Sequence, residues 1–591
     1  NESIEFCTGR EVQDFERDIG PLPYQKFPCK NVVVASLTMV VSLTTSLVGC
    51  FIVSATIGFI YDFSIYSGAL KLHFHLDQSQ LDWVATSGCL MFFVSPICGH
   101  LVDKHGPRPG VLFGGACMTL GLTLSYLFAH DLILPQYGAD PAAATVVLCV
   151  FACLTTIGAN AASAVAYSLP PKLFPRQRGR VTGIVKAFAG LSGGLLAQLY
   201  TLSVSAPSSR PETLTFLMFL GGACFFLDLC IAAWLFPSSK RNRNSADNTE
   251  ETDLVGRLRR GYWVVVVLIL SIFGCSLMTA VPTESTNQSN ATNGTAIIAP
   301  QSPTAIVAVG VFLVIVAAVP VAVSVSWSTT PESNKADAPE YNVLRGSTVV
   351  KNETNQTIDL AENNDVGTFA MLCHLDFWLV AVSGMAAVGG GYMLTTNSFQ
   401  LIQSSTLPDA SADTAISMFS ACQGLARMVG GAGPELVGNA GGATTRRPLF
   451  LSMFCAVMVL GHVLLRLAPV LGSLELLYAG YCLAGIGFGG VWPCLVTISA
   501  DLFGLAHLGS NYMVYDGSTA LIGSLLMGKV LPQYVYENNC EKGSTQCHGG
   551  VCFALAHMVI VVVNVVGALS ALWLWVRVMK RKRKEYRVVQ E

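Results

Sequence analysis

The chain has 591 residues, of which 52% are hydrophobic and only 12% are charged, whereas soluble domains carry about 25% charged residues. The formal net charge of −2 provides no basic field that would attract nucleic acid. The 19 cysteines include no Cys-x-x-Cys pair of the kind that binds zinc or exchanges disulfides. These values exclude a soluble, disordered or nucleic-acid-binding protein, and they predict an all-α polytopic membrane protein.

Fourteen stretches are long and apolar enough to cross a bilayer as helices, which takes about 20 residues each. In chain order they are predicted at 36–66, 81–102, 110–129, 143–168, 181–203, 214–236, 262–281, 304–326, 372–396, 414–438, 448–468, 475–499, 510–533 and 553–576. The first stretch is too long for one straight crossing, so we expect it to tilt or to begin along the membrane surface. Polar residues precede it, so no cleavable signal peptide is expected.

Lys and Arg in the loops set the orientation. The loops after spans two, four, six and ten and the tail carry 21 basic residues, against 5 assigned to the loops after odd-numbered spans. We therefore expect both termini in the cytoplasm, in the plasma membrane or an endosomal or vacuolar membrane. The predicted parts are a cytoplasmic segment 1–31, a six-helix bundle 32–237, a basic loop 238–260, an extra helix pair 261–327, an acidic loop 328–370, a second six-helix bundle 371–577 and a basic tail 578–591.

Sequons and cysteines in the loops give further expectations for the two faces. Asn287, Asn290 and Asn293 lie in the loop after the seventh span, which is predicted to be outside, and we expect glycosylation there. Chance sequons in a Ser/Thr-rich loop are the alternative. Two more, Asn352 and Asn355, lie in the acidic loop, which we expect to be disordered, cytoplasmic and unmodified. In the last outer loop, Cys540 and Cys547 are candidates for a disulfide.

A motif follows the second span: Gly99-His-Leu-Val-Asp103-Lys104-His-Gly106-Pro-Arg108. It resembles the Gly-x-x-x-Asp-Arg/Lys-x-Gly-x-Arg/Lys signature of the major facilitator superfamily. The resemblance implies two six-helix halves with a binding site between them near the midplane. It also implies that Asp103 holds the cytoplasmic ends of the halves together, with Glu435 in the corresponding place of the second half. The alternative is an ordinary charged loop on the cytoplasmic side.

Narrower likenesses cover other segments. Ile65–Leu70, Asp77–Leu81, Gly179–Gly193, Trp492-Pro493 and Leu502–Leu505 resemble the nodulin-like branch of the superfamily, which implies a twelve-helix core with two extra helices. Ala426-Arg427 is more distantly similar to monocarboxylate transporters, which have a functional Arg at this place. One turn earlier this chain has Gln423 where that family has Asp, and its first span offers Asp62 where that family has Lys.

Two basic residues, Lys186 and Arg427, fall within predicted spans rather than in loops. Each costs about 2.5–3.5 kcal/mol at the centre of a membrane helix. We therefore expect partners, with Asp62, Asp228 and Asp516 as candidates, and a water-filled chamber between the halves that both cations border. Purely structural ion pairing is about equally compatible with the pattern.

The candidate substrate-binding residues are Lys186, Arg427, Gln423, Asp62 and Asn397, and the candidate gating residues are Gly99, Asp103, Lys104, Gly106, Arg108 and Glu435. Asn397 also fits a hydrated helix end. Asp376 is expected to be a gating or interface charge.

The prediction is a secondary active transporter of a small polar, anionic solute by alternating access, with a proton as candidate coupling ion. The sequence contains no phosphate-binding loop of the kind that would indicate ATP-driven transport. No enzyme activity, cofactor, metal or nucleic-acid partner is expected, and the lipid-embedded chain is expected to be a monomer. The alternative is a non-transporting membrane sensor or scaffold on the same fold.

Overall fold

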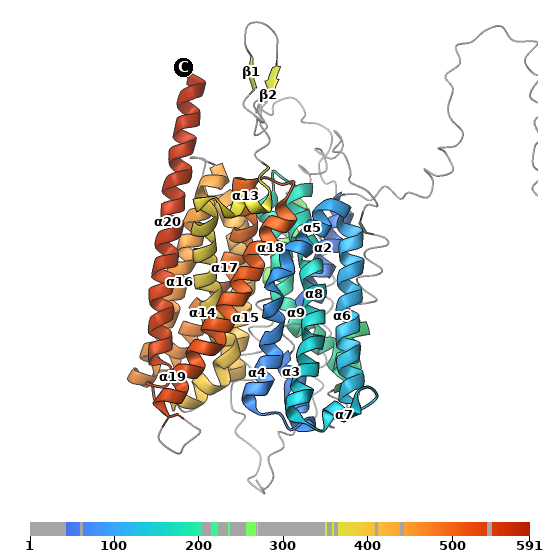
Figure 1. The fold of residues 1–591 in the computed structure, drawn as a ribbon. Helices are drawn as coiled ribbons and strands as arrows, with labels where there is room; N and C mark the ends of the chain where they lie inside the picture. The colour runs from blue at the N-terminus through green and yellow to red at the C-terminus, as the bar shows by residue number, and fades with distance from the viewer. Residues whose placement is uncertain are drawn as a thin grey trace, which may run out of the picture. The chain divides into compact units, whose positions relative to one another are not determined.

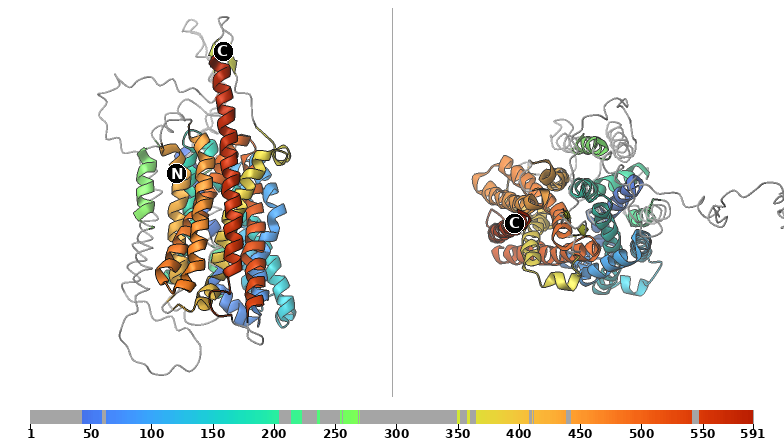
Figure 2. Two further views of the ribbon diagram at one scale, coloured as in Figure 1. Left: turned by 90° about the vertical axis from the view of Figure 1, so that its left-hand side faces the viewer. Right: turned by 90° about the horizontal axis from the view of Figure 1, so that it is seen from above.

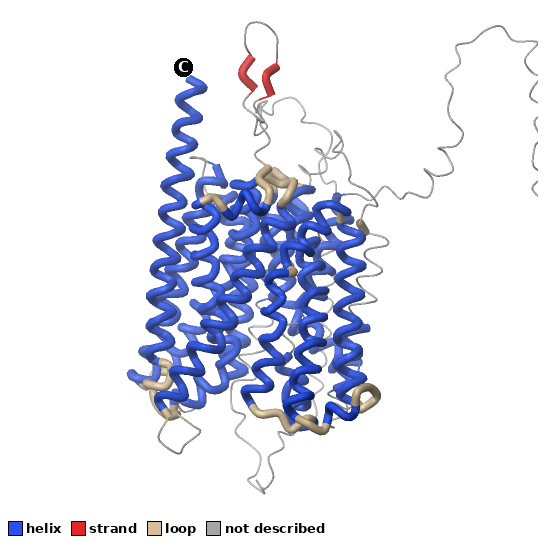
Figure 3. The backbone as a smooth tube through the Cα atoms, viewed as in Figure 1, coloured by secondary structure: helices blue, strands red, loops and turns tan. Residues whose placement is uncertain are grey.

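The computed structural model describes residues 43–58, 63–203, 214–222, 235–236, 254, 256–267, 269, 349–351, 357–359, 365–407, 410, 412–437, 442–540 and 547–590. Nearly all of these residues lie in long helices that run side by side (Figures 1 and 3). The helices of the first half form one cluster and those of the second half another (Figure 2).

The first half contains α2 (Leu43–Ile57), α3 (Phe63–His73), α4 (Gln78–Ser87), η3 (Gly88–Phe93), α5 (Ser95–His105), α6 (Pro107–Ala129), α7 (Pro135–Gly138), α8 (Pro141–Leu173) and α9 (Arg178–Ser203). Local sequence explains several boundaries. Asp77 and Gln80 form a reciprocal capping box at the start of α4. Asp140 caps α8, whose first residue is Pro141.

The second half contains α13 (Thr368–Leu372), α14 (Leu375–Ser405), α15 (Ala412–Leu436), α16 (Gly442–Leu471), α17 (Leu474–Phe503), α18 (Leu508–Thr519), η4 (Ala520–Val530), α19 (Leu531–Asn539) and α20 (Ala554–Gln590). The segments α18, η4 and α19 follow one another without a break, and η4 is a π-helix.

The halves meet mainly where α9 packs on α15 and α17 and where α18 packs on α5 and α8, and η4 also contacts η3 and α4. Glycines allow the closest approach. A Cβ on Gly179 of α9 would lie 2.3 Å from the carbonyl oxygen of Gly431 on α15, and one on Gly431 would lie 2.4 Å from the carbonyl oxygen of Gly179. Small residues bring backbones together in this way within membranes, where apolar burial does not drive association.

The predicted spans agree with the helices in many places. Spans three to five and nine to twelve coincide with α6, α8, α9, α14, α15, α16 and α17, and the last span lies within α20. Six described helices are long and apolar enough to cross a membrane, or seven if the bent α4–α5 pair is one span. Most of spans six to eight lies outside the described residues, so the total of fourteen stays a prediction.

Three expectations about local structure were wrong. The second span is not one helix: it bends by 44° between α4 and α5. The acidic loop contains the antiparallel pair β1 (Val349–Lys351) and β2 (Thr357–Asp359), which short β-branched runs favour. The disulfide joins Cys547 to Cys552, while Cys540 is free. Cys540 follows the last residue of α19, whereas Cys552 lies five residues after Cys547, shortly before α20.

Candidate functional site

Lys186 and Arg427 lie together at the boundary between the halves, on α9 and α15. Their exposed fractions are 4% and 2%. The Arg427 guanidinium donates from Nη1 to the carbonyl oxygen of Lys186 at 2.9 Å and from Nη2 to Oε1 of Gln423 at 3.0 Å. Gln423 lies one turn before Arg427, so its amide oxygen takes the place that a carboxylate would otherwise occupy. The structure thus brings three predicted site residues into one cluster.

The Lys186 ammonium is surrounded by aromatic rings and one carboxylate. It donates to the Tyr512 hydroxyl at 2.5 Å, and that hydroxyl donates to Asp516 at 2.5 Å. The direct distance from Lys186 Nζ to Asp516 Oδ1 is 3.9 Å. Nζ also lies 3.3 Å from the ring centre of Tyr167 and 5.0 Å from that of Trp492. Cation–π contacts and a nearby carboxylate offset the cost of burying the charge.

The expected water-filled chamber is wrong for this structure, since neither cation is open to solvent. The rings of Tyr167, Tyr512 and Trp492 occupy the space around Lys186. Only Asp516 keeps some access, with 20% of its side chain exposed. The cluster is therefore an occluded polar site, with three charged groups and little solvent.

Asp103 joins the halves at the end of the bundle that carries the α5–α6 turn. We call this the inner end, after the orientation expected from the loop charges, and the opposite end the outer end. The Asp103 carboxylate accepts from the backbone N–H groups of Gly509 at 3.0 Å and Ser510 at 2.8 Å, at the start of α18. Lys172 donates to it at 2.6 Å. A carboxylate at a helix N-terminus is stabilised by the free N–H groups and the helix dipole.

The glycines of the motif have separate geometric roles. A Cβ on Gly99 would lie 2.4 Å from the carbonyl oxygen of Gly509, so only glycine lets α5 approach α18 this closely. Gly106 has φ of +90°, which permits the tight turn into α6. Arg108 donates to the carbonyl oxygen of Phe236, and Lys104 is exposed.

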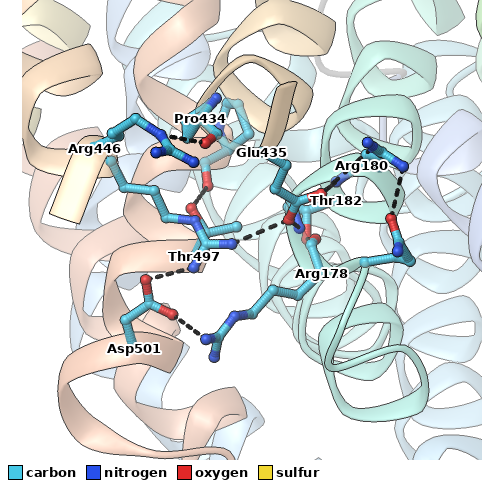
Figure 4. Close-up of polar contacts among 12 residues, drawn as sticks. Arg178, Arg180, Thr182, Pro434, Glu435, Arg446, Thr497 and Asp501 are labelled. Atoms are coloured by element: carbon cyan, nitrogen blue, oxygen red, sulfur yellow. Dashed lines mark hydrogen bonds and ion pairs between the residues drawn. The ribbon is translucent and has the colours of Figure 1, made fainter. Parts of the chain in front are cut away.

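Glu435 forms a second cap between the halves, as Figure 4 shows. It accepts from the backbone N–H groups of Gly179 at 2.6 Å and Arg180 at 3.3 Å, at the start of α9. Arg447 donates to Glu435 at 3.1 Å and also to Asp501. Arg178 forms an ion pair with Asp501 at 2.7 Å. The contacts of Asp103, Glu435 and Asp501 are called the inner clamp below.

Other candidate residues lie elsewhere. Asn397 donates to the carbonyl oxygens of Met393 and Gly528 at 2.9 and 2.7 Å, so its amide protons serve helix packing in this structure. Asp376 accepts from Arg577 and Arg581 of α20. Asp62, Asp228, Asn287, Asn290, Asn293, Asn352 and Asn355 lie outside the described residues.

Sequence reasoning missed several residues of these sites. Lys529 is one of the 5 basic residues counted in the outer loops, but it lies in η4 and is 9% exposed. Arg447 is one of the 21 counted on the inner side, but it lies within α16 and is 2% exposed. Tyr167, Tyr512 and Trp492 carried no signal, because aromatic residues are common throughout membrane helices. No group of three metal-binding side chains occurs in the described parts of the chain.

Comparison with known proteins finds likenesses over parts of the chain. Residues 46–328 match the family model of the Major Facilitator Superfamily. The chain is 33% identical over 116 residues to solute carrier family 15 member 2 of Oryctolagus cuniculus, covering 18% of this chain and 14% of that one. It is 32% identical over 84 residues to monocarboxylate transporter 3 of Gallus gallus, covering 13% and 15%. The matches thus span about one seventh of the length of these relatives.

A solved structure shares the fold. A proton:xylose symporter of the major facilitator superfamily matches with a TM-score of 0.53 at 12% identity, over 91% of this chain and 96% of that one. FucP, a transporter of the same superfamily in the outward conformation, matches with a TM-score of 0.41 at 13% identity, over 91% and 98%. The predicted fold is therefore confirmed: the helices have the arrangement of the major facilitator fold, and six of those described are long and apolar enough to cross a membrane.

Proposed function

We propose that the protein is a secondary active transporter that moves a small anionic solute by alternating access. The observation that carries this proposal is the burial of Lys186 and Arg427 side by side between the two halves. Burial of each cation in a membrane costs free energy. A role in binding a solute, at a boundary between helices that opens during transport, accounts for both cations. Each offers hydrogen-bond donors to a carboxylate that leaves water.

The two cations favour an anionic solute. Lys186 and Arg427 both bring a positive charge to the site, and the Asp516 carboxylate lies 3.9 Å from the Lys186 ammonium. The short likeness to monocarboxylate transporter 3 is consistent with a solute that carries one carboxylate.

The inner clamp supports alternating access. Asp103 and Glu435 each cap a helix of the opposite half, so both contacts must break when the inner end opens. Both caps exchange their partners for water at modest net cost, because exposed N–H groups and carboxylates are well hydrated. A polar clamp of this kind suits an interface that opens and closes repeatedly.

A proton is the coupling ion that the site suits best. Tyr512 donates to Asp516 and accepts from Lys186, so the three groups form one hydrogen-bonded chain. A proton that binds Asp516 removes its negative charge and releases Lys186 toward the solute carboxylate. Return of the proton to the other side would restore the Lys186–Asp516 pair.

Uptake by the purified full-length protein in liposomes tests the function. Short carboxylates, amino acids and vitamins would be supplied with and without an inward proton gradient. We expect saturable uptake of at least one monoanion, at least tenfold weaker in Arg427→Gln, because one charge-assisted hydrogen bond contributes about 1.5–3 kcal/mol. Lys580→Gln, at an exposed tail position, is the matched control and should transport normally.

The same assay separates transport from its alternatives. Asp516→Asn should leave uptake measurable but insensitive to the proton gradient, whereas an intact response would exclude Asp516 as the proton site. A membrane sensor or scaffold would show no uptake of any solute in the wild-type protein. Glycosylation of Asn287, Asn290 and Asn293 would appear as a mass loss after glycosidase treatment, and would place that loop outside.

A further inference from the structure

One continuous helical segment carries contacts at three depths of the bundle. At the start of α18, Gly509 and Ser510 bind Asp103 in the inner clamp. Within the next two turns, Tyr512 and Asp516 contact Lys186 in the buried site. Beyond α18, η4 carries Lys529 toward the outer end. The segment therefore contacts the first half at the inner clamp, at the buried site and toward the outer end.

Lys529 forms a contact between the two halves that the proposed transport site does not use. Its ammonium lies 4.0 Å from the ring centre of Trp83, on α4 of the first half. The side chain is 9% exposed, and its nitrogen has no hydrogen-bond acceptor among the described residues. The carboxylates of Asp82, within α4, and Asp77, which caps α4, favour its charged form. Lys529 is thus held to the first half by an aromatic face and by charge.

The segment that carries Lys529 has an unusual backbone. A π-helix forms i to i+5 hydrogen bonds, is rare, and occurs frequently at functional sites. Here the carbonyl oxygen of Gly528 accepts from two side chains of α14, Thr396 at 2.9 Å and Asn397 at 2.7 Å. These side chains satisfy a backbone acceptor within the wide turns, and so stabilise the π-helix.

We propose that the contact of Lys529 with Trp83 is an outer latch, and that η4 is the joint that releases it. If η4 tightened to an α-helix, with about 3.6 residues per turn, the residues at its far end would rotate relative to α18. Lys529 would then leave the face of Trp83, and the outer end would separate. Asp516, one turn before η4, would link this movement to occupancy of the buried site.

Hydrogen exchange of the full chain in lipid nanodiscs tests the latch without any solute. The variants are Lys529→Gln, which removes the charge, and Lys529→Arg, which keeps a cation for Trp83. We expect exchange in residues 78–87 and 520–530 to rise roughly five- to thirtyfold in Lys529→Gln, as loss of a desolvated cation–π contact implies. Lys529→Arg and the tail control Lys580→Gln should exchange like the wild type.

A second variant tests the ring independently. Trp83→Leu should raise exchange in the same two segments, and adding Lys529→Gln to it should cause little further change, because the two residues form one contact. Unchanged exchange in both single variants would overturn the proposal. An equal rise in α16, which does not contact the latch, would also overturn it, because it would indicate general destabilisation.

The latch proposal depends on the proposed transport function only for the role that it gives to the contact between Lys529 and Trp83. Because exchange is measured without solute, the latch can fail while anion uptake persists. It can equally be shown in a protein that proves to transport nothing. The two proposals therefore fail separately.

Discussion

The two ends of the bundle are closed by different chemistry. At the inner end, two carboxylates cap helices of the opposite half, and Arg178, Arg447 and Asp501 add ion pairs. At the outer end, the Lys529 ammonium lies on the Trp83 ring, and η4 also packs on η3 and α4. Charge-assisted hydrogen bonds at helix N-termini are directional and strong, whereas a cation–π contact tolerates sliding across the ring.

This difference indicates which end opens first. The inner clamp distributes its interactions over several backbone N–H groups, so it opens only when all of them separate. The outer contact depends on one side chain whose helix is irregular. We therefore expect the outer end to open more readily than the inner end in the absence of solute.

Removal of Arg447 is expected to have the largest effect, because it lies between two buried carboxylates. Arg447→Met leaves Glu435 and Asp501 without this partner, and we expect the free energy of unfolding to fall by about 3–5 kcal/mol. The measurement is chemical denaturation in lipid bicelles. The neighbour Arg446, which donates to the carbonyl oxygen of Pro434, supplies the control Arg446→Met with a smaller loss. Equal losses would show that Arg447 has no special place in the clamp.

Removal of the charge of Asp103 tests the other cap. Asp103→Asn keeps the shape but loses charge-assisted bonds to Gly509, Ser510 and Lys172, so we expect a loss of about 1.5–3 kcal/mol. Hydrogen exchange should rise at the start of α18 and not in η4, because only the inner end is loosened. A rise in η4 of the same size would mean that the ends do not close independently.

The helices were largely predictable because apolar length is a strong signal in a membrane chain. The inner clamp was also partly predictable, since Asp103 and Glu435 lie near charged turns that separate the apolar stretches. Loop charges alone did not place Arg447, because a charged residue at a helix end is counted with the loop whichever way its side chain points.

The two cations of the buried site could be predicted from the sequence, but the residues that surround them could not. Lys186 and Arg427 stood out because charge is rare in spans. Their neighbours Tyr167, Tyr512 and Trp492 come from three different helices, and one sequence does not show which helix faces meet. The sequence did not indicate the π-helix, because the composition of this segment matches that of an ordinary apolar helix. The π-helix also depends on side chains of α14, which is distant in the sequence.

Gly99→Ala tests whether close helix approach, rather than charge alone, closes the inner end. A Cβ there would meet backbone atoms of Gly509 at 2.4 and 2.6 Å, so α5 and α18 must separate. Such overpacking costs about 1–3 kcal/mol. Gly68→Ala of α3 is the matched control, because a Cβ at that position has nothing within 4 Å. Thermal unfolding that shifts equally in both variants would contradict a specific packing role for Gly99.

The smallest effect is expected at the outer end, where Asn397 supports η4. Asn397→Leu removes one bond to the Gly528 carbonyl oxygen but leaves the one from Thr396, so we expect a loss of about 1 kcal/mol. Exchange should rise within η4 and leave the start of α18 unchanged, opposite to the pattern for Asp103→Asn. Thr395→Val is the control, because Thr395 bonds only within its own helix, to Tyr392. If Asn397→Leu instead loosened α18 as much as η4, the joint would not separate the two ends, and the inner and outer contacts would open as one unit.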